Sequence, residues 1–111
     1  MMRANHLPIA IAMALSCAAT GAAAADIQAG KARAAEVCEA CHGAGGNSTS
    51  QDFPKLGGQY PDYLAKTLRD YKSGERKNPI MAGFAKTLSK QDIENLAAYY
   101  AAQPATVSFK P

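Results

Sequence analysis

The most regular pattern of hydrophobic and polar positions lies in residues 61–73. Leu64, Leu68 and Tyr71 occur at i, i+4 and i+7, which places them on one face of a helix, and charged residues occupy the opposite face. The stretch begins with a proline, which suits the first helical position, and a glycine follows its end. The pattern therefore predicts an amphipathic helix over the whole range.

A second helical pattern occupies residues 89–102. Ile93, Leu96 and Tyr100 form one apolar stripe along it. The stretch opens with Ser-Lys-Gln-Asp, which resembles a capping box with aspartate in place of glutamate. Pro104 ends the pattern, because proline cannot donate the backbone hydrogen bond that a helix interior requires. We expect this segment to be the last helix.

The remaining segments complete an all-α prediction. Residues 26–41 combine alanines with charged residues and contain no proline, which predicts a first helix. Residues 43–58 contain five glycines and a proline, which predicts a long irregular loop of the kind that lines a site. Within the polar stretch 75–83 we expect Met81 on a loop or a helix edge, followed by a short helical turn at 84–88. No segment alternates as a strand would, so the predicted fold has three main helices and a large loop.

The N-terminal part of the chain has the features of a secretory leader. A basic start at Arg3 precedes an apolar stretch over 7–19, and the small residues at 23–25 form an A-x-A cleavage site. The apolar stretch is shorter than the roughly 20 residues that a membrane span needs. We therefore predict that residues 1–25 are a signal peptide, that the mature chain begins at Asp26, and that it is soluble in the periplasm.

Composition makes a nucleic-acid partner a poor expectation and favours a cofactor. The chain has 12 Lys and Arg and 9 Asp and Glu, and Arg3 lies in the leader, so the mature segment has a net charge of only +2. A nucleic-acid-binding domain would concentrate much more positive charge. Hydrophobic residues make up 48% of the chain, but alanine is the most frequent of them. A small exported domain with so few large apolar side chains usually adds a disulfide, a metal or a cofactor to its core.

The sequence Cys38-Glu-Ala-Cys41-His42 is the attachment signature of c-type haem. Two cysteines three positions apart lie on one face of a helical turn, so both sulfurs can form thioethers along one porphyrin edge. His42 can then offer an imidazole nitrogen to the iron. Export fits this prediction, because bacterial haem c is attached after export.

Three other uses of a C-x-x-C pair compete with haem attachment. A structural zinc site needs four ligands, and the mature chain offers only three adjacent ones. A thioredoxin-like dithiol expects a βαβ context, which this pattern of segments lacks. A plain disulfide stays open, although it would leave the lone histidine and the small core unexplained.

Further short motifs follow the cysteine pair in a fixed order, and the set as a whole resembles the class I c-type cytochromes. They are CEACHG at 38–43, PKLGGQ at 54–59, YL at 63–64, Leu68 with Tyr71, Gly74 with Arg76, MAGF at 81–84 and LAAYY at 96–100. The nearest match is the bacterial cytochrome c4 and c553 type of single-haem domain. The resemblance spans almost all of residues 26–111 and implies one cytochrome c domain folded around one covalently bound haem.

The resemblance implies roles for two residues beside the motif. Met81 is the only methionine of the mature segment, so a His/Met-ligated haem iron can use no other methionine. A lone methionine is otherwise a core filler, and the site would then carry a lysine, a tyrosine or water. The family also implies that the carbonyl of Pro54 accepts a hydrogen bond from the outer nitrogen of His42. Without that role, Pro54 makes the loop more rigid.

Two further features concern packing and charge. By position, the resemblance implies that Gly30 lets the first helix cross the last one against Tyr99, with Ala34 in place of a bulkier residue. A group of basic residues could form a docking surface for acidic redox partners, or it could be an ordinary solvated face. These residues are Lys66, Arg69, Lys72, Arg76 and Lys77.

The expected function is that of a mono-haem electron carrier rather than an enzyme. Two alternatives use the same haem motif: an electron-accepting subunit of a larger dehydrogenase or oxidase, and an open-site haem enzyme or gas binder. Cytochromes c4 commonly have two such domains, but one motif supplies one haem, and we expect a monomer or a weak homodimer. A lipid anchor at Cys17 is disfavoured, because the residue three positions before it is not leucine.

Overall fold

The computed structural model describes residues 1–2, 11, 13–14, 16, 18 and 23–106. The helices are α1 Ile27–Val37, α2 Glu39–His42, η1 Ala44–Gly46, α3 Pro61–Ser73, α4 Pro79–Ala85 and α5 Lys90–Ala101. No strand occurs among the described residues, which confirms the all-α prediction. None of the helices in these ranges is long and apolar enough to cross a membrane. Arg3 and Cys17 lie outside the described residues.

The predicted ends of the second and last helices are confirmed. Helix α3 has its proline in the first turn and ends at Gly74, whose φ of 89° is left-handed and suits glycine. At the start of α5, the Ser89 hydroxyl accepts from the Asp92 N–H at 3.0 Å, and the Asp92 carboxylate accepts from the Ser89 N–H at 2.9 Å. This reciprocal pair is the predicted capping box.

Two predictions about helix boundaries were wrong. Helix α4 begins at Pro79, well before the predicted short turn at 84–88, and Met81 lies in its first turn, at a helix edge, which was one of the two places predicted for it. Pro79 needs no backbone N–H in the first turn, and the side chain of Asn78 caps the helix. The predicted first helix is also divided in two, since Cys38 has φ −117°, away from the helical value near −63°.

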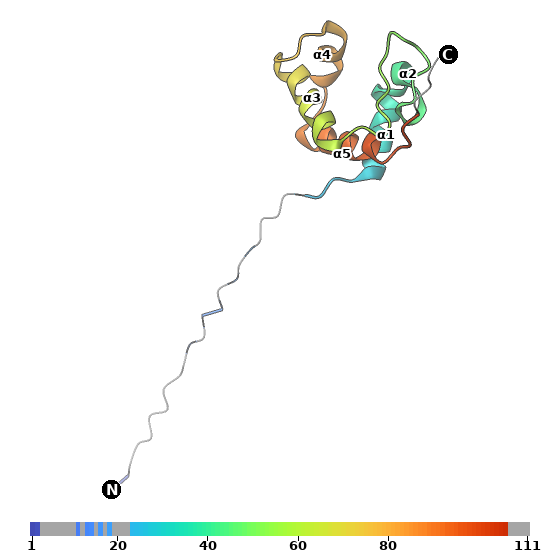
Figure 1. Ribbon diagram of the computed structural model, residues 1–111. Helices are drawn as coiled ribbons and strands as arrows, with labels where there is room; N and C mark the ends of the chain where they lie inside the picture. The colour runs from blue at the N-terminus through green and yellow to red at the C-terminus, as the bar shows by residue number, and fades with distance from the viewer. Residues whose placement is uncertain (3–10, 12, 15, 17, 19–22, 107–111) are drawn as a thin grey trace.

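The helices stand in two groups above α5 (Figure 1), and a cavity lies in the opening between them. Helices α1 and α2 stand on one side of it, α3 and α4 stand on the other, and α5 runs along the base. Helix α5 packs against both α1 and α3. The buried cluster at these contacts consists of Ala34, Leu64, Ala65, Leu88, Ile93, Leu96, Ala97, Tyr99 and Tyr100.

The crossing of α1 over α5 depends on Gly30. A Cβ atom at this position would lie 2.1 Å from the backbone oxygen of Asn95 and 2.9 Å from the Cβ of Tyr99. Ala34, one turn further along α1, is fully buried in the same contact. The predicted crossing of Gly30 against Tyr99 is therefore present, and it brings the two backbones into direct contact.

The start of α1 is tied to the same part of α5. The side chain of Asp26 accepts hydrogen bonds from the N–H groups of Gln28 and Ala29 at 2.9 and 3.0 Å, which caps the helix. The backbone N–H of Asp26 in turn donates to Oδ1 of Asn95 at 2.8 Å. Asn95 is a buried polar residue, and this bond helps to satisfy it.

We predict that Gly30→Ala destabilises the folded protein by about 2–3 kcal/mol, because the new Cβ would overlap the α5 backbone. Denaturant unfolding followed by circular dichroism measures this loss. Gly83→Ala is the matched control, since a Cβ at Gly83 in α4 would have no atom of the described residues within 4 Å beyond its own helix turn. It should raise stability by roughly 0.5–1 kcal/mol through helix propensity. Equal effects of the two substitutions would contradict the packing argument.

Candidate functional site

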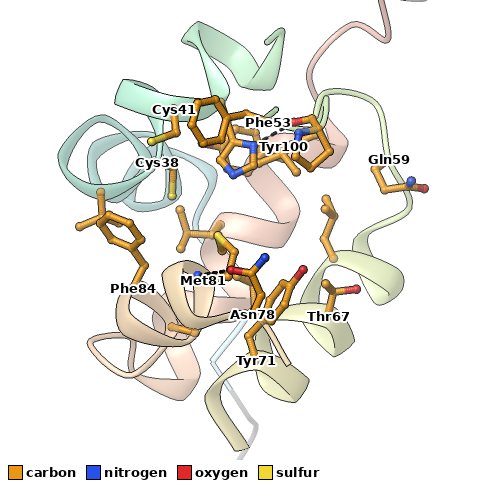
Figure 2. Close-up of a pocket in the computed structure, with 18 of the residues that line it drawn as sticks. Cys38, Cys41, Phe53, Gln59, Thr67, Tyr71, Asn78, Met81, Phe84 and Tyr100 are labelled. Carbon is orange, nitrogen blue, oxygen red and sulfur yellow. Dashed lines mark hydrogen bonds between the residues drawn. The ribbon is translucent and has the colours of Figure 1, made fainter. Parts of the chain in front are cut away.

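A cavity of about 290 Å³ lies between the two sides of the opening. Its size is at the lower end of the range of about 300–1,000 Å³ that is usual for ligand and cofactor pockets. Cys38 and Cys41 lie on one side of the cavity, and Met81 lies on the other (Figure 2). Much of the remaining lining is apolar and comes from α3, α4 and α5 and from the turn before α5: Leu64, Leu68, Ile80, Phe84, Leu88, Leu96 and Ala97. The cavity therefore takes the place of a larger hydrophobic core.

The short helix α2 and the residue before it carry the C-x-x-C-H motif into the cavity. Cys38 and Cys41 are both free thiols and are partly buried. Burial raises the pKa of Cys38 above its usual value, so its sulfur is held as a thiol at neutral pH. Both sulfurs remain unpaired and face the same space.

The imidazole of His42 is fixed by the loop that follows α2. Its Nδ1 lies 2.8 Å from the carbonyl oxygen of Pro54. A carbonyl can only accept, so Nδ1 carries the proton, and Nε2 of the neutral ring keeps a free lone pair. The ring of Phe53 packs edge-on against His42 with 6.3 Å between ring centroids. His42 is buried, and its orientation is set by these two neighbours.

The loop that carries Pro54 is held by contacts that the sequence did not reveal. Gly46, at φ 73°, accepts hydrogen bonds from the N–H groups of Leu56 and Gly57 at 2.8 and 3.2 Å. The N–H of Gly58 donates to the carbonyl of Tyr100 on α5 at 2.9 Å. These bonds hold the segment directly after Pro54 and thereby the carbonyl that accepts from His42.

Hydrogen bonds to the C-terminal segment also hold this loop. The ammonium of Lys55 donates to the hydroxyl of Thr106 at 3.1 Å, and that hydroxyl donates to Oδ1 of Asn47 at 2.8 Å. Lys55 is the neighbour of Pro54 in the chain. Three segments of the chain are thus joined beside the residue that orients His42.

Met81 is presented from the opposite wall by α4. The side chain of Asn78 accepts hydrogen bonds from the N–H groups of Ile80 and Met81, each at 3.0 Å. This cap fixes the first turn of α4, and Met81 lies in that turn with its side chain towards the cavity (Figure 2). The thioether of Met81 and the imidazole of His42 therefore enter the cavity from different elements on opposite walls.

Arg76 belongs to the cavity lining as well as to the predicted basic group. It donates to the hydroxyl of Tyr63 at 3.4 Å and lies over the ring of Tyr71, 5.0 Å from the ring centroid. Its guanidinium lowers the pKa of Tyr63 through this hydrogen bond. Arg76 thus brings a positive charge to the side of the cavity formed by α3 and the segment before α4.

Three of the other basic residues have local partners. Lys66 pairs with Asp70, Arg69 pairs with Glu94 at 2.9 Å, and Lys72 donates to the carbonyl of Leu88. The ion pairs cancel part of the positive charge that the sequence suggested for this surface. The charge available for steering a partner is therefore smaller than the count of basic residues implies.

Comparison with known proteins identifies the family. A family model described as "Cytochrome C oxidase, cbb3-type, subunit III" matches residues 25–99. The chain belongs to this family and is a class I c-type cytochrome. This agrees with the fold, the motif order and the two-sided cavity.

The relatives place this cytochrome in the c4 type. Cytochrome c4 of Pseudomonas aeruginosa is 45% identical over 103 residues, which cover 93% of this chain and 51% of that protein. The crystal structure of reduced recombinant cytochrome c4 from Pseudomonas stutzeri superposes with a TM-score of 0.72 at 43% identity, covering 78% of this chain and 50% of the other. A thiosulfate dehydrogenase electron acceptor from Thiomonas intermedia is 45% identical over 67 residues, 60% of this chain and 31% of that protein. This cytochrome therefore spans about half the length of the cytochromes c4 that it matches.

The lining of the cavity fits haem c, the cofactor of c-type cytochromes. Two free thiols and the available Nε2 of His42 lie on one side, and a thioether sulfur lies on the other. The buried hydroxyl of Tyr100, which also lines the cavity, has no hydrogen-bond partner among the described residues. An unpartnered buried hydroxyl at such a position suits a cavity that a cofactor fills.

We predict that Asn78→Ala destabilises the cytochrome by about 1 kcal/mol, because two N–H groups in the first turn of α4 would lose their acceptor. Asn78→Asp keeps an acceptor oxygen at the same place and is the matched control. Thermal or denaturant unfolding checks both variants. A loss of the same size in Asn78→Asp would show that the cap is not the source of the effect.

Proposed function

We propose that this cytochrome carries single electrons between redox partners through one covalently bound haem c. The observation that carries the proposal is that His42 on α2 and Met81 on α4 line one cavity from opposite sides (Figure 1), and that Cys38 and Cys41 lie on the α2 side. When bound, haem iron supplies the chemistry by taking up and releasing one electron. The chain contains one C-x-x-C-H motif, so we propose one haem.

The site residues divide into attachment and ligation. Cys38 and Cys41 are the proposed thioether positions, supported by two unpaired sulfurs that face one space. Nε2 of His42 and the sulfur of Met81 are the proposed axial ligands of the iron. Pro54 supports His42, because its carbonyl fixes the tautomer and makes the free nitrogen more basic.

The surroundings of these two ligands favour the reduced, ferrous state of the haem iron. Apolar side chains from three helices line the cavity, and a low dielectric penalises the additional positive charge of ferric iron. A methionine sulfur also favours ferrous iron over ferric iron. Rigid anchors on both walls, at Pro54 and at Asn78, limit how far the ligands move when the charge changes.

We also propose export to the periplasm with cleavage after Ala25. The folded part begins at Asp26, which caps α1, and residues 23–25 are exposed and lie outside any helix. A peptidase could therefore reach the predicted A-x-A site without unfolding a helix. The mature cytochrome domain would comprise residues 26–111.

A second candidate role is that of an electron-accepting subunit within a larger dehydrogenase. The similarity to a thiosulfate dehydrogenase electron acceptor favours it, although the match covers only 31% of that protein. In either role the chain itself transfers electrons and converts no substrate. Isolation of the native protein would separate the roles, because an obligate subunit copurifies with a dehydrogenase and a free carrier does not.

Met81→Ala tests the proposed ligation. In the protein produced with export and haem-attachment machinery, we expect the oxidised form to show a near-red sulfur-to-iron absorption band that the variant lacks. Ile27 is exposed and does not line the cavity, so it is the control, and Ile27→Ala should keep the band. Haem without this band in the wild type, together with ready carbon monoxide binding, would indicate an open-site haem protein. No covalent haem at all would overturn the proposal.

We propose that the basic surface steers acidic partners through the charges that have no acidic partner in the described part of the chain, among them Arg76 and Lys77. Lys77→Glu should lower the electron-transfer rate constant with anionic ferricyanide roughly two- to threefold at low salt, and the difference should shrink at high salt. Lys31→Glu makes the same charge change on α1, on the other side of the opening, and should have a smaller effect. Stopped-flow spectrophotometry measures both. Equal effects would show that only net charge matters.

A further inference from the structure

The hydroxyl of Tyr100 is a buried donor without a partner among the described residues. Tyr100 lies on α5, is 3% exposed and lines the cavity. Its oxygen is fully buried and makes no hydrogen bond to that part of the chain. Leaving a buried hydroxyl unpaired is costly, and phenylalanine would fill the same space without that cost. The Tyr100 hydroxyl therefore needs a hydrogen-bond acceptor that the described residues do not supply.

Cys38 lines the same cavity as Tyr100 and packs against the buried cluster to which Tyr100 belongs. Burial raises the pKa of Tyr100 far above its usual value, and the next largest cause is the nearby Cys38 thiol. Conversely, Tyr100 lowers the pKa of Cys38 and so offsets part of the rise that burial causes. The tyrosine thus stays protonated at any ordinary pH, so its hydroxyl keeps its proton available for donation.

We propose that Tyr100 is a positioning residue for the haem attachment, and that its hydroxyl donates a hydrogen bond to the sulfur of Cys38 in the holoprotein. The inference rests on the proposed function. A free thiol has a hydrogen of its own, whereas a thioether sulfur has none and can only accept. Attachment at Cys38 therefore turns the sulfur into a pure acceptor beside a hydroxyl that has no other partner in the described part of the chain.

Such a bond has two consequences that can be measured. The bond holds the Cys38 sulfur in place through α5, a helix that carries neither the C-x-x-C-H motif nor Met81. It also withdraws electron density from the sulfur, which favours the reduced state of the attached group. The bond to a thioether is weak, so we expect an effect of roughly two- to threefold on the reduction equilibrium. This corresponds to about 20–30 mV, since a tenfold change for one electron is 59 mV.

Tyr100→Phe in the holoprotein tests the proposal. Spectroelectrochemistry should give a lower midpoint potential by that two- to threefold factor, and the unfolding equilibrium should favour the unfolded state about fivefold more. Tyr99→Phe is the matched control, because Tyr99 is the adjacent buried tyrosine but packs against Gly30 and does not line the cavity. Its midpoint potential should equal that of the wild type. In the wild-type reduced protein, the Tyr100 hydroxyl proton should be visible by NMR and slow to exchange.

The outcomes separate this inference from the proposed function. A variant Tyr100→Phe that is as stable as the wild type or more so, with an unchanged midpoint potential, would overturn the inference and leave the electron-carrier proposal intact. A rapidly exchanging hydroxyl proton in the wild type would overturn it as well. Absence of covalent haem from the wild type would overturn both proposals.

Discussion

The contact between the α1 and α5 backbones at Gly30 determines where the walls of the cavity lie. With no side chain between them, the two helices cross at a distance that places Ala34 in full burial and directs the C-terminal end of α1 towards the opening. Cys38 follows from that end, and α2 then carries Cys41 and His42. Because α5 also packs against α3, the same helix sets the position of the opposite wall.

The centre of the molecule is a cavity, and this explains the composition of the chain. Leu96 is the one large side chain of the described core with essentially no exposure, and much of the remaining buried cluster is alanine and tyrosine. Small domains with little apolar volume depend on a bound group for part of their stability. The residues that would hold that group each have a support within the chain: the carbonyl of Pro54 holds His42, and the side chain of Asn78 holds the backbone of Met81. Such supports suit a carrier whose ligands should move little when its charge changes.

One charged residue, Arg76, takes part both in the packing of the cavity wall and in the proposed docking surface. Arg76 lies over the Tyr71 ring at the cavity and is also one of the residues of the proposed basic surface. Lys66 and Arg69 contribute less to this surface, because each has an acidic partner on a helix. A weak, partly neutralised surface is consistent with transient docking, in which long-range attraction speeds encounter and adds little to affinity.

Local patterns determined much of this protein. The apolar periodicity and the capping residues specified α3 and α5, and the cysteine motif specified the site, since each depends on residues within a few positions. The tertiary structure decided the rest. The break at Cys38 and the loop anchors on Gly46 and Gly58 depend on contacts between segments that are distant in the sequence. The start of α4 has a local signal, the Asn78 cap followed by Pro79, but the polar stretch around it predicted a loop. Tyr100 belongs in the sequence to an apolar stripe, and only the packing of α5 beneath the cavity shows that its hydroxyl is buried with no partner among the described residues.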